Sequence, residues 1–248
     1  KLYSNKEKVE YFVTPKDSFS FVYYGIDHKR FGISNLYPLF KENIVNPGSI
    51  IDIGSSWGEE VKYLSSLVGK EGKLHCFEPN PVQKDILDMN ILHNKIDNVK
   101  TYNYAVGNKQ GKLKVSNRIW AKNTSIEEGD VDSNGYVKVV KLDDLFFNEP
   151  ISAIKVDTDG FDLDVIYGAM EVIKKYNPLI VVEYLPSLTY SGFKGSDVLR
   201  EYINLGFKLY PPQYLGKHLE INDLDEYIES FSNRYFCQTH DLVLRRAI

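Results

Sequence analysis

Residues 49–60, SIIDIGSSWGEE, join an apolar run to a glycine turn and then to a helical pattern. The run Ile50–Ile53 carries one acid, Asp52, and Gly54 follows it, with Gly58 four residues later. Glycine accepts positive φ and lets a ligand approach the backbone, so such strand–turn–helix units recur at ligand sites on the carboxyl edge of parallel sheets. On this stretch alone, a ligand turn and an idle βα turn are equally good interpretations.

Composition limits the classes of protein that the chain can belong to. Its 248 residues, 43% of them hydrophobic, are enough for one large domain with a full core. The net charge of -4 gives no electrostatic reason to expect nucleic acid as a partner. Two cysteines without a CxxC pair predict neither a disulfide framework nor a zinc site, and fit a cytoplasmic protein. No apolar run approaches the ~20 residues of a membrane span, and the start lacks a signal-peptide core. The oligomeric state stays open.

Strand and helix patterns alternate after the opening stretch, which predicts an α/β fold with a doubly wound, mostly parallel sheet. Residues 47–248 are expected to form this domain. The expected strands cover 73–77, 99–106, 153–157, 179–183, 207–210 and 240–245, and the expected helices cover 59–68, 81–94, 162–176, 196–205 and 224–231.

Two regions lie outside this alternation. Residues 1–46 are expected to form an extension, with a hairpin that turns near 14–17 and a short helix over 36–44. Residues 109–144 hold two short strand patterns and a long polar loop. Because a loop of that length in a compact domain is usually functional, 109–144 is interpreted as a substrate-facing insertion.

Glu78 closes the strand 73–77 in the sequence CFEPNP. In a doubly wound sheet an acid there lies beside the first glycine turn and can accept both hydroxyls of a ribose. The alternative is that Glu78 caps the helix that starts near Pro81. No G-x-G-x-x-G and no G-x-x-x-x-G-K-[ST] is present, so a phosphate-cradling loop is not indicated. Asp52 instead suits a ligand with an ammonium and a sulfonium, and S-adenosylmethionine has both.

A third signal is IKVDTDGFD at 154–162, where Asp157 and Asp159 follow a strand. Glu183 ends the next strand in VVEY. Acids that gather where parallel strands end are more often part of a site than of the scaffold. A single divalent ion held by these three acids ranks below a metal-free site, because the five histidines show no metal-ligand spacing.

Taken together, the segments resemble the FkbM-type S-adenosylmethionine-dependent methyltransferases over about residues 47–185. The segments that carry the resemblance are IIDIGSSWGEE, CFEPNP, NILHNKIDNVKTYNYAVGN, KLDDL, IKVDTDGFDLDVIYGA and PLIVVEY. The resemblance implies a class I methyltransferase fold with a Rossmann-like sheet of seven strands, the last antiparallel. The family commonly has Ala-Asn after the first glycine and Glu at position 159, whereas this chain has Ser55, Ser56 and Trp57 after Gly54, and Asp159.

The resemblance also implies roles for individual residues. The methionine part of the cofactor would lie near the glycine turn and the ribose at Glu78, while Asp157 would face the methyl-transfer side. The cofactor-binding residues expected on this basis are Asp52, Gly54, Ser55, Gly58, Glu78, Asn103, Ala105, Val106 and Asp157, with the last residues of the strand 99–106 along the adenine.

The implied reaction is O-methylation of a hydroxyl on a sugar, a glycan or a natural product. A base would activate the hydroxyl, and Asp157 is the first choice, followed by Glu183 and Asp159. Two alternatives stay open. The first is a nicotinamide-dependent oxidoreductase or epimerase, which the missing third glycine disfavours. The second is a non-catalytic nucleoside-binding module, which stays possible because the turn has Ser-Ser-Trp in place of the common family sequence. Packing is the favoured role for Trp57.

Overall fold

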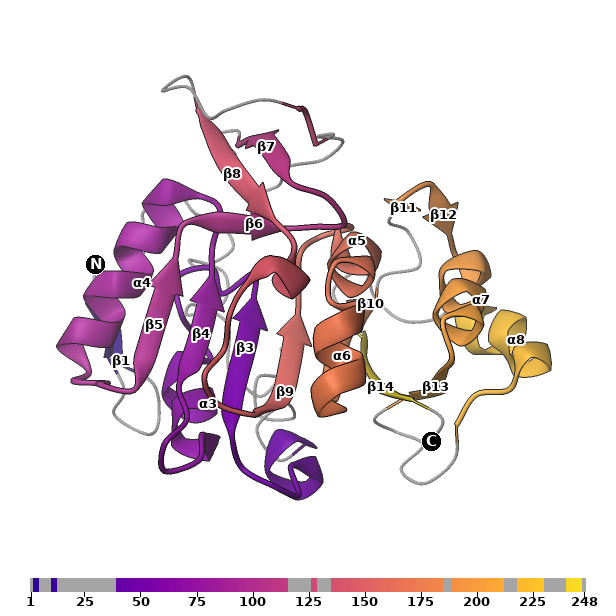
Figure 1. The fold of residues 1–248 in the computed structure, drawn as a ribbon, viewed down its shortest axis with the longest axis horizontal. Helices are drawn as coiled ribbons and strands as arrows, with labels where there is room; N and C mark the ends of the chain where they lie inside the picture. Colours follow the sequence, from indigo (N-terminus) through magenta and orange to yellow (C-terminus); the bar gives the residue numbers. More distant parts are fainter. Residues whose placement is uncertain are drawn as a thin grey trace.

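A seven-stranded sheet runs through the molecule, and β3 (Ser49–Ile53), the strand of the opening motif, lies inside it (Figure 1). The strand order is β13-β14-β10-β9-β3-β4-β5, with β14 antiparallel to both of its neighbours and the pairs from β10 to β5 parallel. The other strands are β4 (Leu74–Phe77), β5 (Val99–Tyr102), β9 (Ile151–Val156), β10 (Leu179–Tyr184), β13 (Phe207–Tyr210) and β14 (His240–Arg246). The predicted α/β class and the mostly parallel sheet with an antiparallel last strand are confirmed.

The computed structural model describes residues 2–4, 10–12, 39–115, 126–128, 135–184, 189–211, 218–229 and 240–246. Within these ranges, none of the helices combines the length and the apolarity that crossing a membrane requires. The helices are α3 (Val61–Leu67), α4 (Pro81–His93), α5 (Asp162–Tyr167), α6 (Met170–Tyr176), α7 (Ser196–Asn204) and α8 (Leu224–Glu229), with 3-10 turns η2 (Leu142–Asp144) and η4 (Ile221–Asp223).

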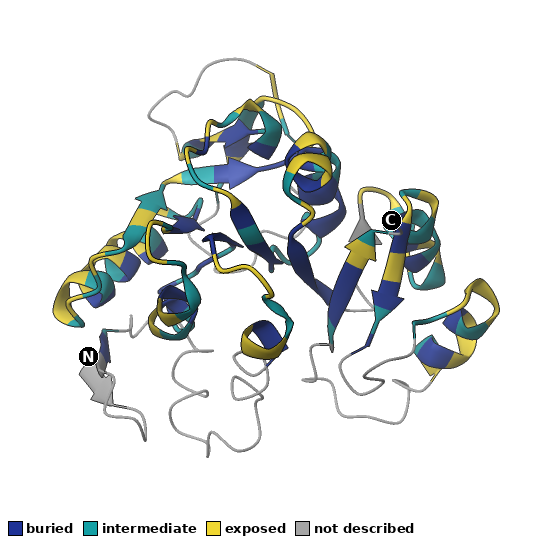
Figure 2. Ribbon diagram, turned by 60° about the horizontal axis from the view of Figure 1, so that its bottom comes forward, coloured by how far each residue is buried: buried dark blue, intermediate teal, exposed yellow. Residues whose placement is uncertain are grey.

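Helices cover both faces of the sheet, and alternate strand residues face opposite layers. Ile51 and Ile53 of β3 belong to the core that includes side chains of α5, α6, α7 and α8. Ile50 belongs to the core with α3, α4 and the helical residues 39–43. Figure 2 shows the central strands almost entirely buried, whereas the helices expose one side. Polar side chains at the ends of the strands are therefore exceptions that need an explanation.

The prediction of a single strand over 99–106 is wrong, because the structure has two strands there. Only β5 joins the main sheet, and β6 (Tyr104–Val106) pairs with β8 (Tyr136–Val140) in a separate three-stranded sheet. β7 (Gly111–Lys114) completes that sheet, which lies above the strand ends in Figure 1. The break falls at Asn103, whose side chain donates hydrogen bonds to the carbonyl oxygens of Glu78 and Pro79.

The helix predicted over 162–176 is also divided, into α5 and α6. The carbonyl oxygen of Gly107 lies 2.0 Å from the position that a Cβ on Gly168 would take, so the chain there approaches another backbone closely. Asp143 of η2 then accepts hydrogen bonds from the backbone N–H groups of Glu171 and Val172 and so caps α6. A contact with η2 therefore decides where the second helix starts.

The expected extension and insertion are partly described. β2 (Glu10–Phe12) pairs antiparallel with β1 (Leu2–Ser4), and the turn predicted near 14–17 lies outside the described residues. Residues 39–43 of the helix predicted over 36–44 are helical. Two parts of the predicted insertion, 116–125 and 129–134, also fall outside the described residues. β11 (Thr189–Tyr190) and β12 (Phe193–Lys194) form a further small hairpin.

Candidate functional site at the carboxyl edge of the sheet

The glycine turn after β3 lies against the segment that follows β9. The N–H of Asp157 donates to the carbonyl oxygen of Ile53 over 2.9 Å, and a Cβ on Gly54 would lie 1.7 Å from the carbonyl oxygen of Asp157. Gly54 and Gly58 have φ of 85° and 88°, and Ser56 has φ of 49°. Only glycine tolerates this packing at position 54, because any side chain would overlap the neighbouring backbone. The two predicted site segments are therefore in direct contact.

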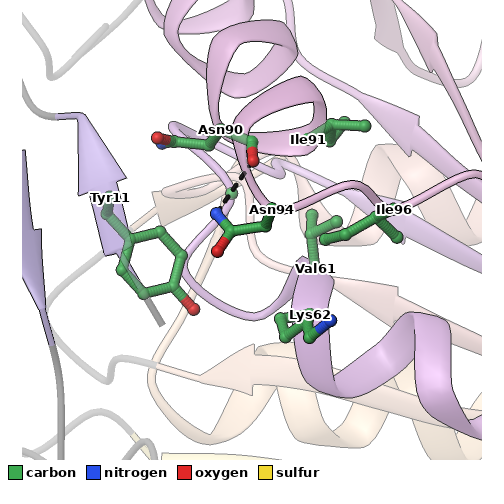
Figure 3. A pocket seen from close by; sticks show the side chains of 8 residues that line it. Tyr11, Val61, Lys62, Asn90, Ile91, Asn94 and Ile96 are labelled. Carbon is green, nitrogen blue, oxygen red and sulfur yellow. Dashed lines mark hydrogen bonds between the residues drawn. The ribbon is translucent and has the colours of Figure 1, made fainter. Parts of the chain in front are cut away.

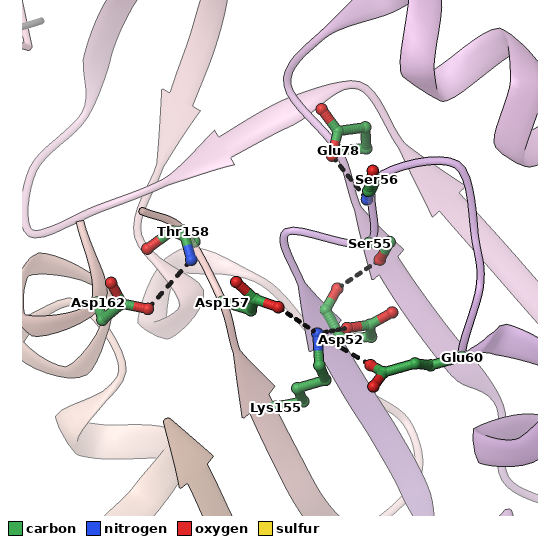
Figure 4. Close-up of polar contacts among 9 residues, drawn as sticks. All are labelled: Asp52, Ser55, Ser56, Glu60, Glu78, Lys155, Asp157, Thr158 and Asp162. Carbon is green, nitrogen blue, oxygen red and sulfur yellow. Dashed lines mark hydrogen bonds and ion pairs between the residues drawn. The ribbon is translucent and has the colours of Figure 1, made fainter. Parts of the chain in front are cut away.

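Lys155 is a buried cation at the centre of this edge (Figure 4). Its Nζ lies 3.0 Å from Glu60 Oε2, 3.1 Å from Asp157 Oδ2 and 3.6 Å from Asp52 Oδ1. Asp52 is directly opposite Lys155 in the pairing of β3 with β9, so strand register places this pair side by side. Lys155 thus joins the glycine turn to the segment after β9.

The charges of this cluster depend on one another. Burial alone would lower the pKa of Lys155, but the carboxylates of Asp157, Glu60 and Asp52 raise that pKa well above its ordinary value. Burial raises the pKa of Asp52 and of Glu60, and Lys155 opposes both shifts. Burial also raises the pKa of Glu59 to about 8. Lys155 therefore stays charged, while Asp52, Glu59 and Glu60 hold protons more readily than ordinary acids do.

A second group of acids continues along the same edge. Glu183 is the last residue but one of β10 and is directly opposite Asp241 of β14. Burial, and then the charge of Asp157 and a hydrogen bond with it, raise the pKa of Glu183 well above its ordinary value. Burial, followed by the charges of Glu60 and Asp157, raises the pKa of Asp241 to about 7. The structure thus brings Asp157 and Glu183 together as the sequence predicts, and adds Asp241.

Glu78 lies beside the glycine turn, at the end of β4. Its two carboxylate oxygens accept hydrogen bonds from the N–H of Ser56, over 2.8 Å, and from the N–H of Asn80, over 2.7 Å. Burial raises the pKa of Glu78 to about 7. The side chain of Asn80 caps α4 by accepting from Val82 and Gln83. Capping is therefore the role of Asn80, and the carboxylate of Glu78 is held against the turn.

Sequence comparison places the chain in a family. Residues 45–209, which are more than half of the chain, match the family model of the methyltransferase FkbM domain. The chain belongs to this family. FkbM methyltransferases are S-adenosylmethionine-dependent enzymes, and the cofactor is S-adenosylmethionine. A comparison with curated proteins found no relative.

Solved structures share the fold of this FkbM protein. The FkbM methyltransferase of Methylobacillus flagellatus KT aligns with a TM-score of 0.51 and 14% identity, over 80% of this chain and 43% of that one. A putative rRNA-methylase from Clostridium thermocellum aligns with a TM-score of 0.52 and 11% identity, over 88% and 97% of the two chains. A putative methyltransferase from Streptococcus mutans, solved with SAH, aligns with a TM-score of 0.49 and 12% identity, over 86% and 96%. This chain spans less than half of the M. flagellatus protein.

The residues around the glycine turn of the FkbM domain fit a cationic nucleoside cofactor. Asp52 is buried beside the turn, and its Oδ1 faces the ammonium of Lys155 at 3.6 Å without a hydrogen bond among the described residues, so a cationic ligand group would give this carboxylate a second positive partner. The Ser55 hydroxyl donates to the carbonyl oxygen of Asp52 and thereby fixes the turn. The carboxylate of Glu78 accepts only one described hydrogen bond at each oxygen, which leaves lone pairs for ribose hydroxyls.

The remaining predicted residues lie elsewhere or serve the backbone. Asn103 is exposed, and its amide binds the chain after Glu78. Ala105 and Val106 are buried on β6, with Ala105 in the core of the small sheet. Asp159 has φ of 53° in the turn after β9. Its charge contributes to the raised pKa of Glu183, so it belongs to the acidic edge.

Sequence reasoning missed Lys155, Glu60 and Asp241. Lys155 is the one charge inside the apolar run before Asp157, and this position was the available signal. No group of three or more His, Cys, Asp or Glu side chains within the described ranges is arranged to hold a metal ion. Trp57 is 4% exposed and packs edge-on against Tyr11, so the packing role predicted for Trp57 is confirmed.

Proposed function

We propose that this FkbM-family protein transfers the methyl group of S-adenosylmethionine to a hydroxyl of a sugar, a glycan or a natural product. The observation that carries the proposal is the position of Asp157, at the end of β9, against Gly54 and between Lys155 and Glu183. When bound, S-adenosylmethionine supplies an electrophilic methyl group on a sulfonium. Alignment of the acceptor oxygen with that methyl group then provides much of the rate acceleration.

Asp157 is the general base of the proposed reaction. An alcohol is a weak nucleophile at neutral pH, and a base that takes its proton contributes typically ~10²–10⁴-fold to the rate. Lys155 holds Oδ2 of Asp157 at 3.1 Å. Burial and the charge of Asp157 raise the pKa of Glu183 well above its ordinary value, which favours the protonated carboxyl that can donate a hydrogen bond to Asp157. These two contacts orient the carboxylate toward the acceptor side.

The charge of this edge favours an uncharged acceptor. Asp157, Asp159, Glu183 and Asp241 all contribute carboxyl groups there, and the described cation beside them, Lys155, is buried. A phosphate-rich polymer would have to approach the partly exposed carboxylates of Asp157 and Asp159, which is electrostatically unfavourable. A hydroxyl on a neutral sugar or natural product carries no such cost. The proposal therefore excludes RNA as the acceptor.

The test is the Asp157→Asn variant. We expect it to bind S-adenosylhomocysteine with a dissociation constant within about threefold of wild type, and to lose about 10²–10⁴-fold in methyl transfer. Transfer of labelled methyl groups would be measured with neutral oligosaccharides and hydroxylated natural products, and with RNA transcripts as the comparison. Asp144→Asn, on the exposed side of η2, is the matched control.

Three results would contradict the proposal. Full activity of Asp157→Asn would remove Asp157 as the base, with Glu183→Gln and Asp159→Asn next to be tested. Transfer to RNA alone would refute the acceptor class. Binding of S-adenosylhomocysteine without transfer to any acceptor would favour the non-catalytic nucleoside-binding module.

A further inference from the structure

The strand β2 of the N-terminal extension lies against the outer side of the glycine turn. The hydroxyl of Tyr11 donates a hydrogen bond to the carbonyl oxygen of Glu59 over 3.0 Å. The ring of Tyr11 packs edge-on against Trp57, with ring centroids 5.5 Å apart and an interplanar angle of 81°. Glu59 and Trp57 both belong to the segment that starts at Gly54. A residue outside the family match, which covers 45–209, therefore touches the cofactor turn.

Asn90 of α4 contacts the same turn as well as β2. Its side chain is 2% exposed, and its Nδ2 donates to the carbonyl oxygen of Trp57 over 2.7 Å. The same amide also pairs with the backbone of Phe12, accepting from its N–H over 2.6 Å and donating to its carbonyl oxygen over 3.1 Å. One buried side chain thus ties β2 and the glycine turn to α4.

Tyr11 and Asn90 both line one small hollow (Figure 3). The other residues that line it are Gly58, Val61, Lys62, Ile91, Asn94 and Ile96. Gly58 ends the turn, and a Cβ there would lie 2.6 Å from Leu87 of α4, so the turn is packed closely against this helix as well. The outer side of the turn is therefore defined by α4 and β2.

The turn needs such support because its backbone is strained. Ser56 is a residue with a side chain at φ of 49°, a conformation that costs free energy unless the surroundings fix it. The N–H of Ser56 is also the group that holds Glu78, the acid assigned to the ribose. A turn that relaxed would therefore move both the glycine backbone and the carboxylate of Glu78.

We propose that Tyr11 and Asn90 are positioning residues for S-adenosylmethionine, and that the N-terminal strand is part of the cofactor site. This inference rests on the cofactor role of the glycine turn. Trp57, where the chain departs from the common family pattern, is the residue on which the strand docks. Because preorganisation lowers the ordering cost of binding, loosening the turn weakens affinity without removing any group that contacts the ligand.

The experiment is calorimetric titration of the full chain with S-adenosylhomocysteine. Tyr11→Phe removes one hydroxyl and keeps the ring, and we expect the dissociation constant to rise about three- to tenfold. Asn90→Ala removes the hydrogen bonds of the Asn90 amide to Trp57 and Phe12, and it should raise the dissociation constant at least about tenfold. Thermal unfolding of each variant without ligand would be measured in parallel. Loss of a purely structural residue would lower the unfolding temperature and leave the dissociation constant unchanged.

Two control variants remove matched hydrogen bonds elsewhere. Asn98→Ala removes an amide that donates to the carbonyl oxygen of Ser65. Tyr184→Phe removes a hydroxyl that donates to the carbonyl oxygen of Gly195. Both should bind S-adenosylhomocysteine like wild type. Unchanged affinity in Tyr11→Phe and Asn90→Ala would overturn the inference, and Tyr11→Phe alone decides it if Asn90→Ala does not fold. A wild-type chain that failed to bind S-adenosylhomocysteine would refute the proposed function itself, and the inference with it.

Discussion

Lys155 is the residue on which the charge balance of the site depends. Its ammonium faces the carboxylates of Asp52, Glu60 and Asp157, and removing one partner of a buried ion pair typically costs about 3–5 kcal/mol. We therefore expect Lys155→Met to lower the free energy of unfolding by about 3 kcal/mol or more at pH 8, measured by urea denaturation. The loss should be smaller at pH 5.5, because carboxylates without their cation can then take up protons.

Two further variants test this explanation of Lys155. Lys155→Met combined with Glu60→Gln removes one positive and one negative charge, so it should recover part of the lost stability. Lys174→Met removes an exposed lysine paired with Glu171, and it should change stability by no more than about 1 kcal/mol. If Lys155→Met were as stable as Lys174→Met, the ion cluster would not hold the two segments together.

The sequence could place Asp52, Asp157 and Glu183 at this edge of the sheet, but it did not indicate Glu60, Asp241 or the cation Lys155. Asp52 and Asp157 follow from the rule that ligand groups gather at the carboxyl ends of parallel strands. The position of Lys155 opposite Asp52 depends on the register between β3 and β9, which are about a hundred residues apart in the chain. Asp241 depends in the same way on the return of β14 beside β10. Such pairs become visible only when the strands are paired.

At the scale of elements, α6 is capped by a residue distant in sequence. Asp143 accepts hydrogen bonds from the N–H groups of Glu171 and Val172, over 3.0 and 2.9 Å. Loss of a helix cap costs about 0.5–2 kcal/mol, so Asp143→Ala should lower the free energy of unfolding by about 1 kcal/mol. Asp144→Ala is the matched neighbour, since the carboxylate of Asp144 is exposed and accepts a hydrogen bond from the side chain of Gln110 without capping a helix. Equal urea midpoints for the two variants would contradict the capping role.

The same contact explains why element boundaries were predicted less well than element types. Residues 162–176 have a continuous helical pattern, and their sequence does not predict that Asp143 caps a second helix that starts at Met170. The strand expected over 99–106 divides at Asn103 because its amide binds the backbone after Glu78. In both cases a contact with a residue distant in sequence outweighs the local helix or strand propensity, and such a contact exists only in the folded chain.

For the molecule as a whole, alternating patterns were sufficient to predict the doubly wound sheet. Each predicted strand of the main sheet is present, because buried strands in such sheets are short apolar runs bounded by turns. The contact between β2 and the glycine turn could not be predicted. It depends on Tyr11 and Asn90, which are unremarkable in sequence and come together only in the folded chain.

The raised pKa values at the carboxyl edge predict how stability depends on pH. Burial raises the pKa of Glu59 to about 8, and those of Glu78 and Asp241 to about 7, far above the values of an unfolded chain. Between about pH 5 and pH 8 the folded state therefore binds more protons than the unfolded state, and stability falls as pH rises. His75 acts in the opposite direction, because burial lowers its pKa, but the buried acids outnumber it, since the pKa of Asp162 is also raised to about 6 and that of Glu183 is raised well above its ordinary value.

We therefore expect the ligand-free chain to be at least about 1 kcal/mol more stable at pH 6 than at pH 8.5, measured by urea denaturation at constant ionic strength. Glu78→Gln should reduce this difference, because the amide does not titrate. Saturating S-adenosylmethionine should reduce it as well, since its positive charges favour the ionised carboxylates around the turn. Stability that instead increased from pH 6 to pH 8.5 would mean that these acids are ionised in the folded chain, and that the acidic edge is solvated rather than buried.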